Sequence, residues 1–305
     1  MEDNFHQVTN YTVTSEYEGV RLDNCLIAKL KGLPRTKIYS IIRKGEVRVN
    51  KSRSKPSMKL KKGDLIRIPP HRTSSISKVF TSKNIKERVS NSIIASERDF
   101  LILNKPVGIA CHGGSGISSG VIEALREIDL RYKDAQLAHR IDRDTSGCLV
   151  IALKKSFLRK LHQEIRNKQV DKIYDLVVFG NWPKELTSIN KPLLKSKGKS
   201  GEREAIIDKN GKESSTEFTL KETNKSYSLL KAKIITGRMH QIRVHVTSEG
   251  YPIVGDIKYG DESLNEKARE KGLNRMLLHA NSISFKNLGI KCSTDTPNLF
   301  KEIMS

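Results

Sequence analysis

The sequence predicts an α+β protein built on a mixed, mainly antiparallel sheet, and three observations carry this prediction. Apolar runs of strand length outnumber the segments with helical periodicity. Strands and helices do not alternate regularly, as they would in a doubly wound fold. The chain has 305 residues, which is too long for one small module and favours a large domain with a smaller one.

The first 70 residues predict a tail followed by a small helix–helix–strand domain. Residues 1–17 carry little pattern and are expected to form the tail, with one short strand as the alternative. The domain, over 18–70, begins with a helix at 21–31, whose apolar positions are Leu22, Cys25, Leu26 and Leu30. A second helix follows Pro34, capped by Thr36, with Ile38, Ile41 and Ile42 facing inward. Residues 46–50 alternate as a strand, and 64–68 are expected to close the domain as another.

The remainder of the chain predicts a linker and then the larger domain. Residues 71–92 follow two prolines, are rich in Ser, Thr and Lys, and are expected to be a flexible linker. The second domain is expected over 93–305. It contains predicted strands at 100–103, 173–179 and 227–236. It also contains an amphipathic helix at 156–168, with Phe157, Leu158, Leu161 and Ile165 on one side.

Charge indicates a polyanionic partner, with nucleic acid ahead of a membrane surface. The formal net charge is +22 and the isoelectric point is about 9.8. A general drift towards lysine is the alternative explanation, but it would spread charge over the whole chain. Residues 29–62 instead carry thirteen Lys or Arg and one acid, Glu46, so this segment supplies +12 of the +22. The concentration favours a dedicated nucleic-acid-binding face.

Several classes of protein are disfavoured. The longest apolar run is about six residues, against roughly 20 for a membrane span. The N-terminus lacks the basic and apolar regions of a signal peptide. The four cysteines are scattered, without the spacing of a disulfide framework or a zinc site. We expect a soluble, cytoplasmic protein without a resident metal.

The most informative segment is residues 139–147, which read H-R-I-D-R-D-T-S-G and lead into an apolar run at 148–153. It puts two carboxylates, Asp142 and Asp144, in a tight turn just before a buried strand. A carboxylate there is costly unless a cation or hydrogen-bond donors hold it ionised. A purely structural turn does not need this density of charge, so the segment is a candidate catalytic site.

This segment resembles the H-R-L-D-x-x-T-S-G signature of the RluA family of pseudouridine synthases. Three further segments agree with the family in order: L-N-K-P at 103–106 with Gly108 and H-G-G at 112–114; K-I-Y at 172–174; and T-G-R-M-H-Q-I-R-V-H at 236–245. The resemblance runs from about residue 18 to residue 280, and the stretch after Phe285 fits it poorly. It implies the pseudouridine synthase fold for 93–305 and isomerisation of several uridines in 23S ribosomal RNA by a monomer, without a cofactor.

The resemblance also assigns roles in catalysis. Asp142 matches the nucleophile, whereas Asp144 stands at a position that the family leaves variable. Arg243 matches the active-site arginine, which would keep Asp142 ionised; the alternative is an ordinary exposed arginine on a strand. Tyr174 matches the active-site tyrosine, which would stack on the uracil or move a proton; the alternative is a core residue.

Further residues are expected to bind the RNA. A target uridine must leave its stack to be reached, and Arg140 resembles the residue that fills the vacated space, with a phosphate contact as the alternative. Leu278 matches an apolar position beneath the base, or is a plain core leucine. Arg238 is expected to have a structural or phosphate-contacting role. The N-terminal domain resembles a small αL-type RNA-binding module shared with a ribosomal protein, and its expected phosphate contacts are Arg35, Lys37, Arg43, Lys44 and Arg48.

Other interpretations remain open. The histidines His139, His240, His245 and His279 lie in motif segments but lack metal-binding spacing, so we expect them to be structural. The glycine-rich segment at 112–116 is expected to lie near the RNA and matches neither a hydrolase nor a phosphate-loop motif. The alternatives to a 23S rRNA enzyme are a non-catalytic RNA-binding assembly factor, a transfer-RNA pseudouridine synthase and, remotely, a hydrolase.

Overall fold

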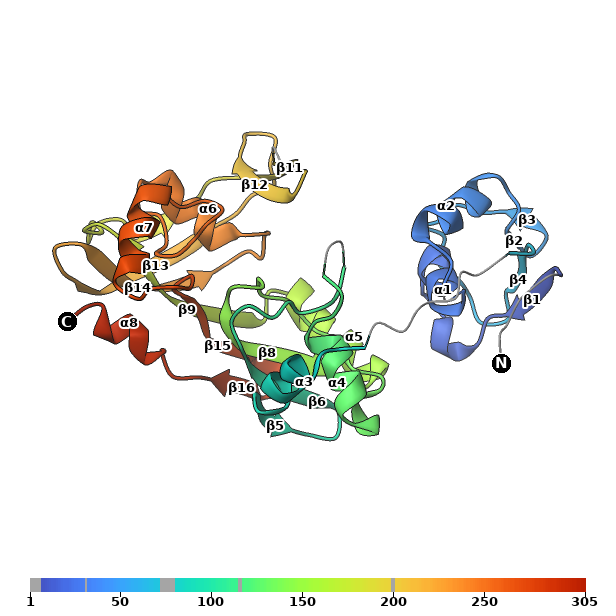
Figure 1. Cartoon of the computed structure of the whole chain (residues 1–305). Helices are drawn as coiled ribbons and strands as arrows, with labels where there is room; N and C mark the ends of the chain where they lie inside the picture. Colours follow the sequence, from blue (N-terminus) through green and yellow to red (C-terminus); the bar gives the residue numbers. More distant parts are fainter. Residues whose placement is uncertain (1–6, 31, 72–79, 115–116, 199–200) are drawn as a thin grey trace. The chain divides into compact units, whose positions relative to one another are not determined.

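The computed structural model describes residues 7–30, 32–71, 80–114, 117–198 and 201–305, in two compact units, 1–78 and 79–305 (Figure 1). We call them the N-terminal and the C-terminal unit. Parts of three predicted segments lie outside the described residues: the tail at 1–6, the linker at 72–79, and the glycine-rich loop at 115–116.

The N-terminal unit packs two helices on a small antiparallel sheet, with strand order β1-β4-β2-β3. The predicted apolar positions of both helices are buried in one core. Strand β1 belongs to the expected tail, so the short-strand alternative holds for that part, and β4 is the last strand of the unit, as predicted, and pairs with both β1 and β2. The elements are β1 (Thr9–Thr12), α1 (Leu22–Lys29), α2 (Arg35–Arg43), β2 (Arg48–Val49), β3 (Ser52–Arg53) and β4 (Leu65–Ile68).

The start of α2 differs from the prediction. Pro34 occupies the N-cap position and no side chain caps the helix, while Thr36 lies within the first turn. A proline is well suited to a helix start because it has no N–H to leave unpaired. The expectation that Thr36 caps this helix is therefore wrong.

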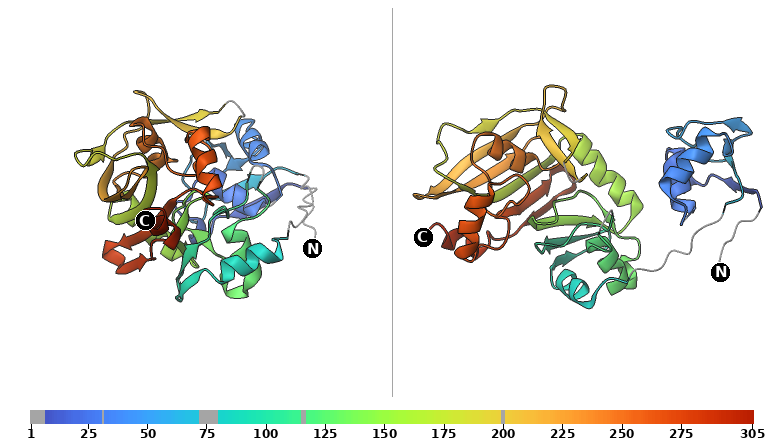
Figure 2. Two further views of the ribbon diagram at one scale, coloured as in Figure 1. Left: turned by 60° about the vertical axis from the view of Figure 1, so that its left-hand side comes forward. Right: turned by 45° about the horizontal axis from the view of Figure 1, so that its top comes forward.

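The C-terminal unit is built on one long mixed sheet, with strand order β10-β13-β14-β9-β15-β8-β6-β5 over the described residues. The pairing of β15 with β8 is parallel and the other pairings are antiparallel, as the fold class requires. A separate hairpin of β11 and β12 projects beside α6 (Figures 1 and 2). The strands are β5 (Ile93–Ser96), β6 (Phe100–Lys105), β7 (Gln136–Leu137), β8 (Ser146–Ala152), β9 (Val170–Phe179), β10 (Ser188–Ile189), β11 (Leu193–Lys197), β12 (Arg203–Ile207), β13 (Thr216–Thr223), β14 (Tyr227–Ile234), β15 (Leu278–Phe285) and β16 (Ile290–Ser293).

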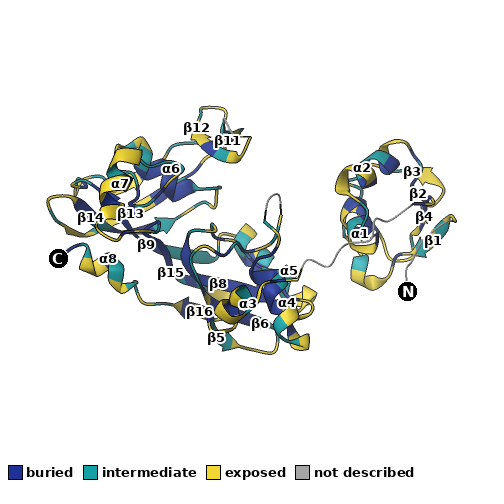
Figure 3. Cartoon of the chain, viewed as in Figure 1, coloured by how far each residue is buried: buried dark blue, intermediate teal, exposed yellow. Residues whose placement is uncertain are grey.

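Both faces of this sheet are covered by helices, which explains the continuous apolar run in β8. Leu149 and Ile151 face a core with α3, α4 and α6, whereas Cys148 and Val150 face another core with α5. Strand β8 is buried along its length, as Figure 3 shows. Helices α7 and α8 cover the second face further along the sheet. The helices are α3 (Lys83–Ser90), α4 (Val121–Ile128), α5 (Lys155–Arg166), α6 (Gln241–Ser248), α7 (Glu262–Glu270) and α8 (Asn298–Glu302).

Helix α3 lies in a segment that was expected to be a flexible linker. Ser82 caps it by accepting a hydrogen bond from the Ile85 N–H, and Val89 is fully buried in the core shared with α4. This part of the linker prediction is therefore wrong. The helix is rich in polar side chains and is anchored by very few apolar contacts, so its sequence does not show the apolar pattern of a packed helix. Among the described residues, no helix is long and apolar enough to cross a membrane.

Candidate active site

Asp142 lies in the loop between β7 and β8, at the point where β8 enters the core. The loop is tightened by a hydrogen bond from the Thr145 N–H to the Asp142 carbonyl (3.2 Å). Gly147 then has a φ of +109°, and a Cβ atom there would lie 2.3 Å from the carbonyl oxygen of Ala280 on β15. Only glycine permits this close approach, so Gly147 fixes where the loop meets the sheet.

A buried lysine, Lys105 at the end of β6, holds the Asp142 loop against the loop that follows β6. Its ammonium donates hydrogen bonds to the carbonyls of Pro106 (2.8 Å), Ile109 (2.7 Å) and Arg143 (3.0 Å). The Gly108 N–H adds a bond to the Arg143 carbonyl at 2.9 Å. Burial lowers the pKa of Lys105 to about 8. Two segments of the family resemblance are thereby joined through one side chain.

Arg243 reaches Asp142 from helix α6. Its Nη1 donates to Asp142 Oδ2 at 3.0 Å, and its side chain is only 8% exposed. The alternative of an exposed arginine on a strand is therefore wrong on both counts. The structure brings Asp142 and Arg243 together from positions 101 residues apart.

A second carboxylate, Asp256, holds the other side of the same guanidinium. It accepts bonds from Arg243 Nε (2.7 Å) and Nη2 (2.8 Å), and from the backbone N–H groups of Lys258 and Tyr259. Burial opposes ionisation of Asp256, yet the bonds and charge of Arg243 hold its pKa below the usual value. Burial likewise opposes the charge of Arg243, but Asp256 and Asp142 raise its pKa. The arginine is thus a fixed cation beside Asp142.

Tyr174, on β9, is buried in the core cluster that also contains Ile141, Ile242 and Leu278. Burial raises the pKa of its hydroxyl, and the charge of Asp142 acts in the same direction. The tyrosine is therefore a protonated, neutral group near the carboxylate. Leu278 packs with it at the start of β15, which fits either of the two roles considered for it.

His240 approaches Asp142 from the other side. Its Nε2 lies 3.9 Å from Asp142 Oδ1, and its Nδ1 lies 2.7 Å from the Tyr259 hydroxyl. The residue has a φ of +53°, in the left-handed region that side chains other than glycine seldom occupy. Tyr259 also lies under the Arg243 guanidinium, 4.9 Å from its ring centroid. Asp142 thus has the Arg243 guanidinium beside one carboxylate oxygen and the His240 imidazole beside the other.

Of the other motif histidines, His245 and His279 are buried and His139 is half-buried. His245 is bonded to Ser214 and Thr216, and His279 to Ser146 and Thr294, each through both ring nitrogens. His139 Nε2 faces the Val150 N–H at 3.0 Å, while its buried Nδ1 finds no partner among the described residues. Within that same part of the chain, no three His, Cys, Asp or Glu side chains are grouped to hold a metal ion.

The remaining predicted residues of the C-terminal unit lie on its surface. Arg140 is exposed next to the Asp142 loop. Asp144 is also partly exposed and pairs with Arg143 at 3.2 Å, so it does not share the Arg243 contact. Arg238 is exposed and its Nε donates to the Glu213 carbonyl at 3.0 Å, away from Asp142. The structure therefore groups Asp142 with Arg243 but leaves Arg238 outside this group.

The predicted phosphate contacts of the N-terminal unit are all exposed: Arg35, Lys37, Arg43, Lys44 and Arg48. The helix α2 turns its apolar residues inward and its cations outward, because Ile38, Ile41 and Ile42 are buried. Arg48 alternates with the buried Val47 and Val49 in the same way. The unit thus presents its positive charge to solvent.

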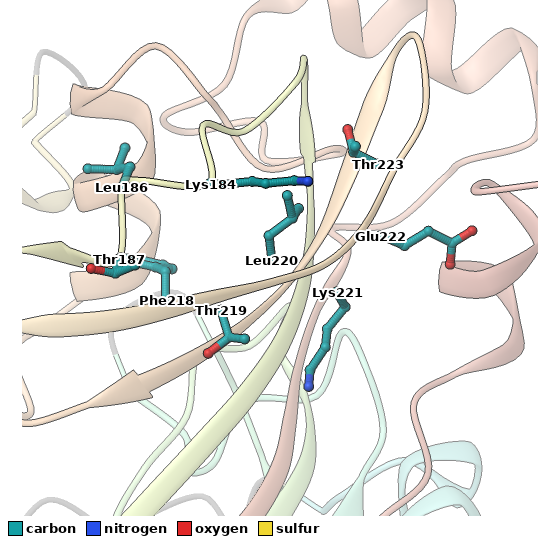
Figure 4. Close-up of a pocket in the computed structure, with 9 residues that line it drawn as sticks. All are labelled: Lys184, Leu186, Thr187, Phe218, Thr219, Leu220, Lys221, Glu222 and Thr223. Carbon is teal, nitrogen blue, oxygen red and sulfur yellow. The ribbon is translucent and has the colours of Figure 1, made fainter.

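The structure also contains a pocket elsewhere, along strand β13 (Figure 4). Its lining includes Phe218, Leu220 and Lys184, the last two lying side by side. None of Asp142, Arg243, His240 or Tyr259 lines it. We therefore place the candidate active site at Asp142 and not at this pocket.

Sequence reasoning missed four residues of this site: Asp256, His240, Tyr259 and Lys105. Asp256 directly follows the apolar stretch 251–255, as Asp142 precedes one. A carboxylate beside an apolar stretch is costly to bury without a partner, so this position could have been found from the sequence. The other three stand in or near the quoted motifs, but nothing in their spacing indicates which partner each one meets.

Sequence comparisons identify relatives for both parts of the chain. The sequence model of the RNA pseudouridylate synthase family matches residues 99–248, and that of the S4 domain matches residues 20–66. The ribosomal large subunit pseudouridine synthase C of Haemophilus influenzae is 48% identical over 278 residues, covering 90% of this chain and 86% of its own. Its namesake in Escherichia coli strain K12 is 43% identical and covers 91% and 88%.

Solved structures agree on the fold. Human RNA pseudouridylate synthase domain containing 4 superposes with a TM-score of 0.59 at 21% identity, over 72% of this chain and 93% of that one. Human RNA pseudouridylate synthase domain containing 1 gives 0.57 at 27% identity, over 68% and 83%. The resemblance, the fold and the relatives lead to one conclusion. The chain belongs to the RNA pseudouridylate synthase family and carries an N-terminal S4 domain.

Proposed function

We propose that this enzyme converts specific uridines of 23S ribosomal RNA to pseudouridine, with Asp142 as nucleophile acting on a flipped-out uridine. The observation that carries the proposal is the Asp142 carboxylate itself. It is 24% exposed at its side chain, and one oxygen is held by Arg243, which is locked in turn by Asp256. A carboxylate that faces solvent from a fixed position suits attack on a bound nucleoside.

The reaction breaks the bond between ribose C1′ and uracil N1, turns the base, and joins C1′ to C5. The proton on C5 leaves and N1 gains one, so the step requires no redox partner. Asp142 acts at the base or at the ribose, with the fixed charge of Arg243 beside it. Tyr174 supplies an aromatic surface and a protonated hydroxyl close to the charge, in keeping with the raised pKa of its hydroxyl.

The substrate assignment draws on the relatives and on charge. The relatives are named as synthases of the large ribosomal subunit. The exposed cations of the S4 domain suit the phosphates of a large folded RNA. Arg140 is exposed in the segment that leads to Asp142, and we assign it the role of filling the space left by the flipped base.

The test is tritium release from C5-labelled uridine, with full-length enzyme and transcripts of 23S rRNA, 16S rRNA and a set of transfer RNAs. We expect release from 23S rRNA alone, reaching a small fixed number of sites per molecule. Release from transfer RNA alone would keep the chemistry and overturn the substrate. No release from any of the three would favour a binding protein without activity.

A further inference from the structure

The two oxygens of the Asp142 carboxylate have different surroundings. Oδ2 accepts the bond from Arg243 Nη1 at 3.0 Å. Oδ1 faces His240 Nε2 at 3.9 Å, which is too long for a direct hydrogen bond. Oδ1 is therefore the oxygen that remains available to a substrate, and His240 is the side chain opposite it.

The hydrogen bonds of Tyr259 support one assignment of the proton on His240. The backbone N–H of Ala205 donates to the Tyr259 hydroxyl oxygen at 2.9 Å. Among the described residues, His240 Nδ1 lies 2.7 Å from the same hydroxyl, and we take it as the acceptor of the hydroxyl proton. Burial lowers the pKa of His240, although Asp142 acts in the opposite direction, and so favours the neutral ring. A neutral ring that accepts at Nδ1 carries its hydrogen on Nε2.

A donor and an acceptor consequently face each other across 3.9 Å. One oxygen atom about 2.8 Å from each fits between them, provided that it accepts from Nε2 and donates to Oδ1. Uracil offers atoms that only donate or only accept. In an RNA chain the ribose 2′-hydroxyl does both. The left-handed backbone of His240, which the N-terminus of α6 maintains, is the kind of local strain that is found at functional sites.

We propose that His240 and Asp142 together bind the ribose 2′-hydroxyl of the target uridine. The pair then forms the point at which the enzyme distinguishes a ribonucleotide from a deoxyribonucleotide. This inference rests on the proposed function, because it takes Asp142 to face the flipped nucleoside. Tyr259 acts through His240 and is a positioning residue.

The test crosses enzyme variants with two substrates. A 23S rRNA fragment around a uridine that the wild type modifies is prepared with C5-tritiated uridine or 2′-deoxyuridine at that position. Single-turnover release is compared for wild type, His240→Asn, His240→Gln and Tyr259→Phe. Asparagine tolerates the left-handed backbone but does not reach Asp142, whereas the glutamine Nε2 takes the place of the histidine Nε2.

We expect the wild type to release tritium about 10- to 100-fold more slowly from the deoxy substrate. His240→Asn should be slowed by a similar factor on the ribose substrate and should no longer distinguish the two. His240→Gln should recover part of the preference. Tyr259→Phe should lose part of it, because the Nδ1 of His240 is then no longer held as an acceptor.

Two results would overturn the inference. The first is an undiminished 2′-hydroxyl preference in His240→Asn, as expected if a water molecule alone bridges the pair. The second is an undiminished preference in Tyr259→Phe. Thermal midpoints and RNA affinity identify a variant that fails to fold, and the Tyr259→Phe comparison then decides. Absence of release by the wild type on the ribose fragment would instead count against the proposed function.

Discussion

At the scale of single residues, Asp256 determines where the charge of Arg243 is directed. It occupies Nε and Nη2 and leaves Nη1 for Asp142. A buried arginine with two carboxylates is stable because all three ions are paired and hydrogen-bonded, whereas removal of one partner leaves an uncompensated charge. The fixed orientation of the guanidinium, and with it the position of Asp142, is lost if Asp256 is changed.

We therefore expect Asp256→Asn to reduce the single-turnover rate about 100-fold, as misplacement of a reacting group by about 1 Å does. The free energy of unfolding should fall by about 3 kcal/mol. RNA affinity, measured by filter binding, should be unchanged. Asp261→Asn is the matched control, because Asp261 is an exposed N-cap of the nearby helix α7. A normal rate in Asp256→Asn would contradict this account of Arg243.

Residues also show why sequence reasoning reached only part of the site. The segment that holds Asp142 and Asp144 was found from its own neighbourhood, since charge before a buried strand is costly, and Asp142 was chosen between the two through the family resemblance. Its partner Arg243 is 101 positions away and was identified only through the family resemblance. His240 was expected to be structural with the other motif histidines, yet it faces Asp142. Long-range pairing depends on the sheet, and local spacing carries no information about it.

At the scale of elements, Lys105 links the end of β6 to the loop that precedes β8. Its three hydrogen bonds satisfy carbonyls of both segments. Lys105→Met would leave these acceptors buried without donors, so we expect a loss of about 2–4 kcal/mol in the free energy of unfolding, measured with urea. The same change at Lys154, an exposed residue paired with Asp99, should have little effect. Equal losses in the two variants would contradict the role of Lys105.

The same lysine makes a prediction about pH. The pKa of Lys105 is about 8 in the folded protein and 10.5 in its ordinary state. Between these values the unfolded chain binds the extra proton, so stability increases with pH in that window. The free energy of unfolding of the wild type should rise relative to Lys105→Met from pH 8 to about 10. A flat difference over this range would show that Lys105 is not buried as described.

Elements were predicted best where a pattern is local. Two local patterns correctly predicted which side chains are buried: the apolar spacing of residues 22–30 and the alternation in 46–50. Helix α3 was missed because its one fully buried residue, Val89, gives no periodic signal. Thr36 was chosen as a cap on residue type, although Pro34 was already suited to the helix start.

At the scale of the whole molecule, the chain combines an S4 domain that carries exposed cations with a unit that carries the carboxylate site. The side chains that contact Asp142, Arg243 and His240, belong to the C-terminal unit, and we assign the charge of residues 29–62 to affinity for the RNA. Each phosphate contact releases counterions. It adds about 0.7–0.9 to the salt slope, which is the steepness with which log affinity falls as log salt concentration rises. The two units should therefore be separable by experiment.

We expect the triple variant Arg43→Gln, Lys44→Gln and Arg48→Gln to bind 23S rRNA more weakly and to reduce the salt slope by about 2–3. Its rate at saturating RNA should be unchanged. Lys209, Lys221 and Lys225, exposed on the C-terminal unit, provide the matched substitution to glutamine. An equal reduction of the slope in both triple variants would contradict a dedicated role for the S4 domain.

The central claim is that Asp142, and not its neighbour Asp144, performs the reaction. The most direct measurement is single-turnover tritium release from C5-labelled 23S rRNA by wild type, Asp142→Asn and Asp144→Asn, with RNA binding measured in parallel. We predict that Asp142→Asn binds RNA normally and releases no tritium, while Asp144→Asn retains most of the rate because its carboxylate pairs only with Arg143 at the surface. Full activity in Asp142→Asn, or its loss in Asp144→Asn alone, would contradict the account.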